Sequence, residues 1–326
     1  AARPAAGPPA AAPAASGRRL AASMSAIHHL PQDWDYNLIN IEQFAHGDSS
    51  AVFRARLSRN LDQRVAVKRV IPFSEEQVGD LLNEIRYLRK FRSVPGIVTM
   101  YRAGYHGVLA PGTEVFLLLE PAAGDLGKEV SAGTQREIKG RARLKLFADI
   151  TRAVRDMERA GVSHGNLSPE NILVLGDCAG RPGCHAVLSD LGKVSDISAK
   201  SRDRDYRSMA FILELLLTRG HPAAEVAAAM AGERAPAGAE GGADSRALSG
   251  LAQIWRAMTA AQASTDFPVA MVLEAVEALA ADVGVDASPR AVPELKGWSK
   301  VRHAIRGLMP DRGHPARPWH ARPPPP

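Results

Sequence analysis

One lysine and one glutamate in the first third of the chain lie next to residues that are expected to be buried. Lys68 follows the apolar residues 65–67, so its ammonium group must either reach solvent or find an anion. Glu84 lies in a segment with apolar residues at helical spacing, adjacent to the stripe expected to be buried. A surface lysine at a strand end and a solvated glutamate are the simpler interpretation of each residue alone.

The most specific pattern in the chain is residues 164–173, which read His-Gly-Asn-Leu-Ser-Pro-Glu-Asn-Ile-Leu. This pattern resembles the catalytic loop H-R-D-L-K-P-E-N-I-L of the protein kinase superfamily, with seven identical positions. Further stretches resemble other kinase motifs in the family's order: residues 45–52 the glycine-rich loop, 65–68 the lysine strand, 117–122 the hinge and 189–192 the D-F-G motif.

The resemblance implies a nucleotide site with ATP and Mg²⁺ as cofactors. Lys68 and Glu84 would form the ion pair that orients the nucleotide, and Asn171 and Asp190 would hold Mg²⁺. In the hinge, Leu119 would be the gatekeeper, and the Glu120 carbonyl and Ala122 N–H would face adenine. The positions implied to contact the nucleotide are Gly47, Val52, Ala66, Lys68, Leu119, Glu120, Ala122 and Leu173.

The departures from the family pattern concern catalysis. Asn166 stands where active members carry the aspartate that accepts the substrate's proton, and Ser168 and Gly165 replace the usual lysine and arginine. A side-chain amide is not a base, and a positioned base contributes about 10² to 10⁴-fold to the rate. In the glycine-rich loop, Gly47 alone remains of three glycines, which implies a stiffer phosphate clamp.

The segment that would dock a peptide substrate is short. Twelve residues separate Gly192 from Asp205, which begins a stretch resembling the family's central helix, and no A-P-E sequence occurs. An activation segment with its docking platform needs a longer chain.

The order of the strands and helices that must position these residues indicates an α+β, bilobal, protein-kinase-like fold. Alternation and turn residues predict a five-stranded antiparallel N-terminal lobe with one inserted helix at 75–91. The strands are expected at 36–41, 52–57, 65–70, 97–101 and 115–119. The second lobe is mostly helical, with helices expected at 144–160, 206–218, 247–261 and 269–281 and a strand pair at 172–175 and 186–188.

Composition divides the chain into two lobes and two tails. We expect a disordered Ala/Pro-rich tail at 1–32, the N-terminal lobe at 33–121, the C-terminal lobe at 122–285 and a basic Pro-rich tail at 286–326. The net charge of +6 comes from the tails, so a nucleic-acid partner is not indicated. Apolar runs are too short to span a membrane. We assign the tails no function, and organelle targeting stays open.

Two cysteines, Cys178 and Cys184, lie in a Gly/Pro-containing stretch. The alternatives are a Cys178–Cys184 bridge, a metal site with His185, or two loop thiols. We favour loop thiols, and hence the cytoplasm or another reducing compartment, because the chain has no disulfide framework.

These observations favour a pseudokinase, a domain that binds ATP and acts through protein partners with impaired catalysis. The alternative is a weakly active or atypical Ser/Thr protein kinase that transfers the γ-phosphate of ATP to a protein. A small-molecule kinase of the aminoglycoside type also needs an aspartate at position 166, so it is less favoured.

Overall fold

The computed structural model describes residues 38–47, 49–131, 138–176, 178, 183–218, 242–260, 265 and 267–294. The tail expected at 1–32, residues 295–326 of the second tail and residues 219–241 lie outside these residues.

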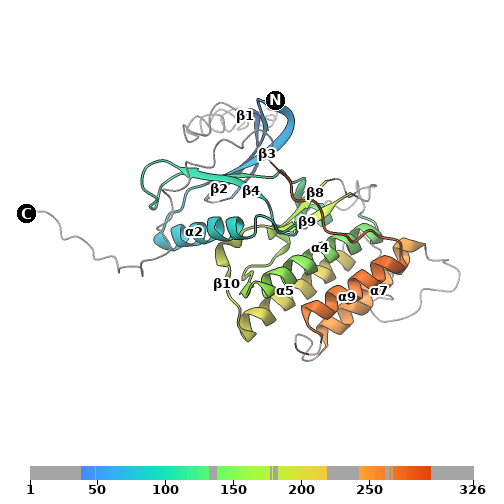
Figure 1. Cartoon of the computed structure of the whole chain (residues 1–326). Coiled ribbons are helices and arrows are strands. Elements are labelled where there is room, and N and C mark those ends of the chain that lie inside the picture. The colour runs from blue at the N-terminus through green and yellow to red at the C-terminus, as the bar shows by residue number, and fades with distance from the viewer. Residues whose placement is uncertain are drawn as a thin grey trace, which may run out of the picture. The chain divides into compact units, whose positions relative to one another are not determined.

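The N-terminal part of the chain forms a five-stranded antiparallel sheet in the order β1-β2-β3-β5-β4 (Figure 1). The strands are β1 (Leu38–His46), β2 (Ser50–Leu57), β3 (Asn60–Val70), β4 (Met100–Tyr105) and β5 (Val115–Leu119). Helix α2 (Glu75–Lys90) is inserted between β3 and β4. This confirms the predicted five strands and single helix.

Local sequence signals explain where α2 begins and which side it buries. The Oγ of Ser74 accepts a hydrogen bond from the Gln77 N–H, which satisfies one free amide of the first turn. Acidic residues occupy the first turn and basic residues the last, as the helix dipole favours. The buried side contains Val78, Leu81, Glu84, Ile85, Tyr87 and Leu88. Glu84 is therefore held on the face of α2 that meets the rest of the domain.

The fourth strand begins later than the sequence suggested. The apolar run 97–101 is divided between two partners: Ile97 forms a parallel bridge with Leu188 of the second lobe, and β4 starts at Met100. The Val98 N–H donates to the Leu188 carbonyl at 2.9 Å. An apolar run predicts burial but does not identify its partner, so the prediction of a strand at 97–101 is wrong in its bounds.

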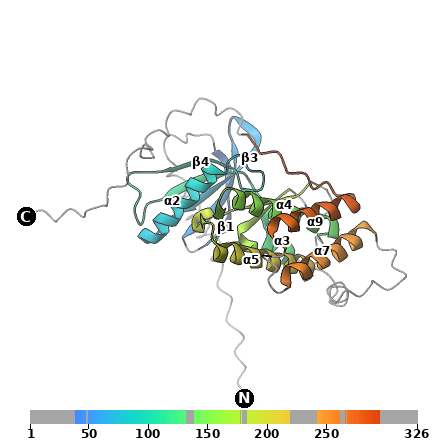
Figure 2. The same ribbon diagram turned by 60° about the horizontal axis from the view of Figure 1, so that its bottom comes forward.

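Beyond the sheet the chain is mostly helical, as predicted. The helices are α3 (Leu126–Ser131), α4 (Gly140–Arg159), α5 (Ala199–Thr218), α7 (Ala243–Thr259) and α9 (Val269–Asp282). Helix α4 contacts α5, α7 and α9, and Figure 2 shows these four helices next to one another. The buried apolar residues of both parts form one continuous core. Among the described helices, none is long and apolar enough to cross a membrane.

Short strands and 3-10 turns lie in the segments between the helices. The strands β6 (Gly124–Asp125), β8 (Ile172–Leu175) and β9 (His185–Leu188) form one small sheet. A second pairs β7 (Val162–Ser163) with β10 (Ser195–Asp196). Two 3-10 turns, η2 (Pro169–Asn171) and η3 (Leu191–Lys193), precede β8 and β10 respectively.

Helix α5 begins seven residues before the predicted start at Tyr206, at Ala199. Its first two turns are polar, so they carry no apolar period. The Ser198 Oγ accepts the Ser201 N–H at 3.1 Å, which supports the early start. After β10 the chain therefore enters α5 almost at once, with little room for a docking segment.

The two cysteines form a disulfide, contrary to the expectation of two loop thiols. Cys178 and Cys184 are six positions apart, flank the tip of the β8–β9 hairpin and are both buried. Antiparallel pairing of β8 with β9 brings the ends of the hairpin together, which spacing alone could not establish. The argument for a reducing compartment from free thiols therefore loses its basis.

Reduction of this disulfide is expected to lower stability modestly. Closing so short a loop stabilises the fold by roughly 2 kcal/mol in the chain-entropy account, so dithiothreitol should lower the Tm by several degrees. The double variant Cys178→Ser/Cys184→Ser should show the lower Tm with and without reductant. An equal response to dithiothreitol in both proteins would contradict a disulfide at this position.

Candidate functional site

The ion pair suggested by the sequence is present. The Lys68 Nζ lies 2.7 Å from Glu84 Oε1 and 3.0 Å from Oε2, with the lysine side chain 20% and the glutamate 7% exposed. Burial lowers the pKa of Lys68, but the carboxylates of Glu84 and Asp190 more than offset it, so the pKa is raised above its usual value. Lys68 is therefore positively charged, and both carboxylates stabilise its charge.

Three polar residues from two consecutive loops meet near Lys68. The Asn171 Nδ2 donates to the Asn166 carbonyl at 2.8 Å, and the Asn166 Nδ2 lies 3.5 Å from Asp190 Oδ2. The Ser189 N–H donates to the Asn171 carbonyl at 2.8 Å, which joins the two loops. Asp190 has a left-handed backbone (φ 57°), an uncommon conformation for a residue other than glycine. Such conformations cluster at functional sites.

The oxygens of Asn171 and Asp190 suit a magnesium ion. Mg²⁺ prefers hard oxygen ligands and is commonly held by one or two protein side chains together with substrate phosphates. Asn171 uses its amide nitrogen on the Asn166 carbonyl, which leaves its side-chain oxygen to act as a ligand. One carboxylate and one amide oxygen therefore suit an ion whose remaining ligands include phosphate oxygens, rather than an ion bound by protein ligands alone.

Three more of the predicted residues lie on the adjacent strands β2, β3 and β5 of the five-stranded sheet: Val52, Ala66 and Leu119. Val52 pairs with Lys68 across β2 and β3, and Ala66 pairs with Leu119 across β3 and β5, so the side chains within each pair share a face. Leu173 lies on β8, half-buried, opposite Val187. Gly47 forms the β1–β2 turn through its N–H to the Ser50 carbonyl at 2.8 Å, without the positive φ that glycine permits.

The hinge makes contacts that the sequence did not indicate. The Arg54 Nη2 donates to the carbonyls of Ala122 at 3.1 Å and Ala123 at 2.6 Å. The Arg54 guanidinium lies 3.5 Å from the centre of the Phe44 ring, a cation–π contact. Glu120 is 4% exposed, and its carboxylate binds Arg290 and the Thr99 N–H. Both ends of the predicted adenine segment are thus fixed by arginines far away in sequence.

A buried aspartate binds the backbone of the loop before Asn166. Asp205 accepts the His164 N–H at 2.6 Å and the Gly165 N–H at 3.0 Å. The His164 Nε2 lies 3.1 Å from the Ser189 carbonyl, and its Nδ1 accepts the Asn166 N–H at 3.3 Å. The ring is therefore neutral, with its proton on Nε2. Burial lowers the pKa of His164, outweighing the opposite effect of Asp205.

Gly165 occupies a position that a larger residue cannot fill. Its φ is +82°, and a Cβ built on it would overlap the carbonyl oxygen of Lys193, with Arg204 close by. The chain after Asp190 thus passes directly over the backbone at the position where the family pattern has arginine. The loss of that side chain follows from the path of this segment.

Helix α2 is fastened to the same segment by further contacts. The Asn83 Nδ2 donates to the carbonyls of Gly192 and Val194, both at 2.8 Å. The Lys193 Nζ lies 2.6 Å from Asp80 Oδ2 and 3.3 Å from Glu76 Oε1. These contacts hold α2 where Glu84 reaches Lys68.

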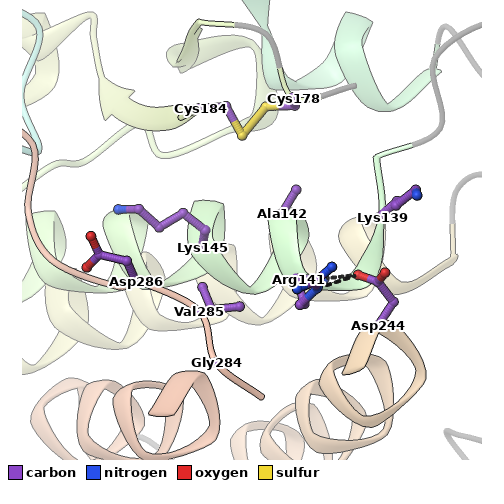
Figure 3. A pocket seen from close by; sticks show the side chains of 10 residues that line it. All are labelled: Lys139, Arg141, Ala142, Lys145, Cys178, Cys184, Asp244, Gly284, Val285 and Asp286. Atoms are coloured by element: carbon purple, nitrogen blue, oxygen red, sulfur yellow. Dashed lines mark hydrogen bonds and ion pairs between the residues drawn. A yellow bond between two sulfur atoms is a disulfide. The ribbon is translucent and has the colours of Figure 1, made fainter. Parts of the chain in front are cut away.

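A separate cavity of about 230 Å³ lies in the helical part of the domain (Figure 3). It is lined by Lys139, Arg141, Ala142, Lys145, Cys178, Cys184, Asp244, Gly284, Val285 and Asp286. None of these is a predicted site residue. Arg141 and Lys145 are engaged with Asp244 and Asp149 respectively.

An arginine at position 165 is expected to be poorly tolerated. Gly165→Arg combines a left-handed backbone, which costs roughly 1–2 kcal/mol for a residue with a Cβ, with overlap on the Lys193 carbonyl. Its Tm should fall clearly below that of Gly161→Arg, the matched control, because Gly161 has φ +78° but open space around its Cβ position. Equal Tm values for the two variants would show that the overlap is relieved at no cost.

The buried neutral His164 is expected to make stability depend on pH. Its pKa is depressed in the folded state, so the unfolded chain binds a proton below about pH 6.5 more readily than the folded one. Stability should therefore be lost as the pH falls below this value, by up to about 1.4 kcal/mol per pH unit. Urea unfolding between pH 7.5 and 5.5 measures this slope. His164→Gln should flatten it, and an unchanged slope would contradict the assignment.

Comparison with protein families agrees with this geometry. The family model described as Protein kinase domain matches residues 39–228, more than half of the chain. No curated protein matches the chain significantly. The matched region contains the sheet, helix α2, the loop around Asn166 and the residues that follow Asp190. The chain therefore belongs to the protein kinase family.

Proposed function

We propose that this protein kinase domain is a pseudokinase, which binds ATP with Mg²⁺, transfers phosphate poorly or not at all, and acts by binding other proteins. The observation that carries the proposal is the amide of Asn166 beside the carboxylate of Asp190, in a site that otherwise keeps its lysine, glutamate and two metal-type oxygen ligands.

Nucleotide binding is supported by the charges that remain. Lys68 is a half-buried cation with a raised pKa, oriented by Glu84, and it would contact the phosphates. Asp190 and Asn171 would hold Mg²⁺, which neutralises phosphate charge when bound. Ala66, Val52 and Leu173 would enclose the adenine, and Leu119, Glu120 and Ala122 would border it. Phosphate binding would therefore rest on Lys68 and Mg²⁺, with a glycine-rich loop that keeps Gly47 alone of its three glycines.

Impaired transfer is supported at three positions. Asn166 cannot accept the proton of a substrate hydroxyl. Ser168 brings no positive charge toward the transferred phosphate. The segment after Asp190 crosses over Gly165 and enters α5 within a few residues, so no extended platform aligns a peptide among the described residues. Each loss removes transition-state stabilisation and leaves ground-state binding in place.

A binding role also fits the way α2 is held. In many kinases the position of this helix depends on phosphorylation of the activation segment. Here Asn83 and Lys193 fix α2 through uncharged and charged contacts within the unmodified chain. The position of α2 is therefore fixed without phosphorylation, as suits a module that binds proteins constitutively.

The alternative is a weakly active Ser/Thr protein kinase. It is favoured by the same intact Lys68–Glu84 pair, because positioning and charge neutralisation supply most of phosphoryl-transfer catalysis. The two proposals differ in whether the γ-phosphate leaves ATP.

Thermal stabilisation and phosphate transfer separate these functions. The full chain should be stabilised by ATP in the presence of Mg²⁺, by about 2.7 kcal/mol at a ligand concentration of 100 Kd. Lys68→Met should abolish the shift, and Asp190→Asn should remove its Mg²⁺ dependence. With γ-³²P-ATP and a generic protein substrate, we expect no transfer above that of Lys68→Met.

Restoring the base tests which loss matters most. Asn166→Asp supplies a carboxylate but leaves Gly165 and the short segment unchanged, so we expect no gain in transfer. Transfer by the wild-type chain that Lys68→Met abolishes would establish the weakly active kinase instead. The absence of any nucleotide shift in the wild type would refute ATP binding.

A further inference from the structure

The chain beyond α9 runs back along the domain as an ordered strap, residues 285–290. The Arg152 Nη2 donates to the Ala287 carbonyl at 2.7 Å, and the Lys145 Nζ donates to the Ser288 carbonyl at 3.0 Å. Both donors lie on α4, and Figure 3 shows Asp286 close to Lys145. These residues belong to the same compact unit as the sheet and helices. The ordered domain thus extends past the boundary expected at residue 285.

The strap ends at Arg290, whose side chain reaches the hinge. Its Nη1 and Nη2 donate to the two carboxylate oxygens of Glu120 at 2.8 and 2.6 Å. Its Nε donates to the Pro95 carbonyl at 2.7 Å, and Nη2 also lies 3.2 Å from the Ile97 carbonyl. The side chains are 9% exposed for Arg290 and 4% for Glu120. One guanidinium therefore binds both the hinge and the loop between α2 and β4.

Glu120 is tied by its backbone to the same loop. Its N–H donates to the Thr99 carbonyl at 3.0 Å, and its Oε1 accepts the Thr99 N–H at 2.6 Å. Arg290 balances the charge of this carboxylate and is the cation paired with it among the residues that the structure describes. Loss of the arginine would make that location unfavourable for Glu120, so the hinge would rearrange around it.

We propose that Arg290 is a positioning residue for the nucleotide site: it fixes the Glu120 side chain at the α2–β4 loop and so holds the hinge backbone in the geometry that receives adenine. The nucleotide part rests on the proposed function. Arg290 lies well beyond the matched region, which ends at residue 228, so the site depends on a segment outside the family pattern.

The contact requires an arginine. The planar guanidinium presents donors in two directions, toward the paired carboxylate oxygens and toward the carbonyls of Pro95 and Ile97. A lysine in this position keeps the charge beside Glu120 but has a single compact ammonium group. Arg290→Lys therefore removes the geometry without leaving a buried carboxylate unpaired, and it provides a folded variant if Arg290→Met does not fold.

Hydrogen–deuterium exchange of the full chain without nucleotide tests whether Arg290 holds the hinge backbone. We expect Arg290→Lys, and more strongly Arg290→Met, to raise exchange of peptides covering residues 97–99 and 119–123 at least tenfold, with α5 and α7 unchanged. Arg207→Met is the control, because Arg207 pairs with Asp203 on the exposed face of α5. Unchanged hinge exchange, or an equal rise across the whole domain, would overturn the proposal.

Nucleotide affinity tests the link to the site. A fluorescent ATP analogue with Mg²⁺ should bind Arg290→Lys about tenfold more weakly than the wild type and bind Arg207→Met as the wild type does. Equal affinity in Arg290→Lys despite a loosened hinge would overturn the positioning role. If the wild type binds no nucleotide, the proposed function fails, while the exchange data still decide whether Arg290 holds the hinge.

Discussion

The ion pair between Lys68 and Glu84 is the interaction on which the architecture around the site depends. It joins the central strand of the sheet to helix α2 in a place where neither charge has full access to water. Each partner needs the other there, because a lone buried charge is costly. The helix must therefore approach the sheet closely, and Asn83 and Lys193 extend this approach to the segment after Asp190.

The fold could be predicted from the sequence wherever the signal was local. Alternating apolar residues identified β2 and β3, and the 3.6-residue period identified α2, α4, α7 and α9. The failures came where an apolar run had a distant partner or a polar run carried no period. Ile97 bridges to Leu188 instead of extending β4, and the polar start of α5 carried no period. Cys178 and Cys184 meet because β8 and β9 pair, a fact that spacing does not encode.

The candidate site likewise contains residues that could be identified from the sequence and residues that could not. Its motif residues could be located from sequence because each lies in a short pattern of fixed order. Arg54 and Arg290 could not, since they act on hinge atoms from 68 or more positions away and belong to no pattern. The Gly165 position was recognised as a departure, but its reason, the path of the Lys193 carbonyl, is a tertiary contact.

That path has a consequence for how this domain can change over time. Asparagine and aspartate codons differ by one nucleotide, so a single mutation can place a carboxylate at position 166. The crossing at Gly165 is different, because an arginine there requires the backbone at Lys193 to move. A larger side chain at position 165 therefore depends on a prior change in the segment around Lys193.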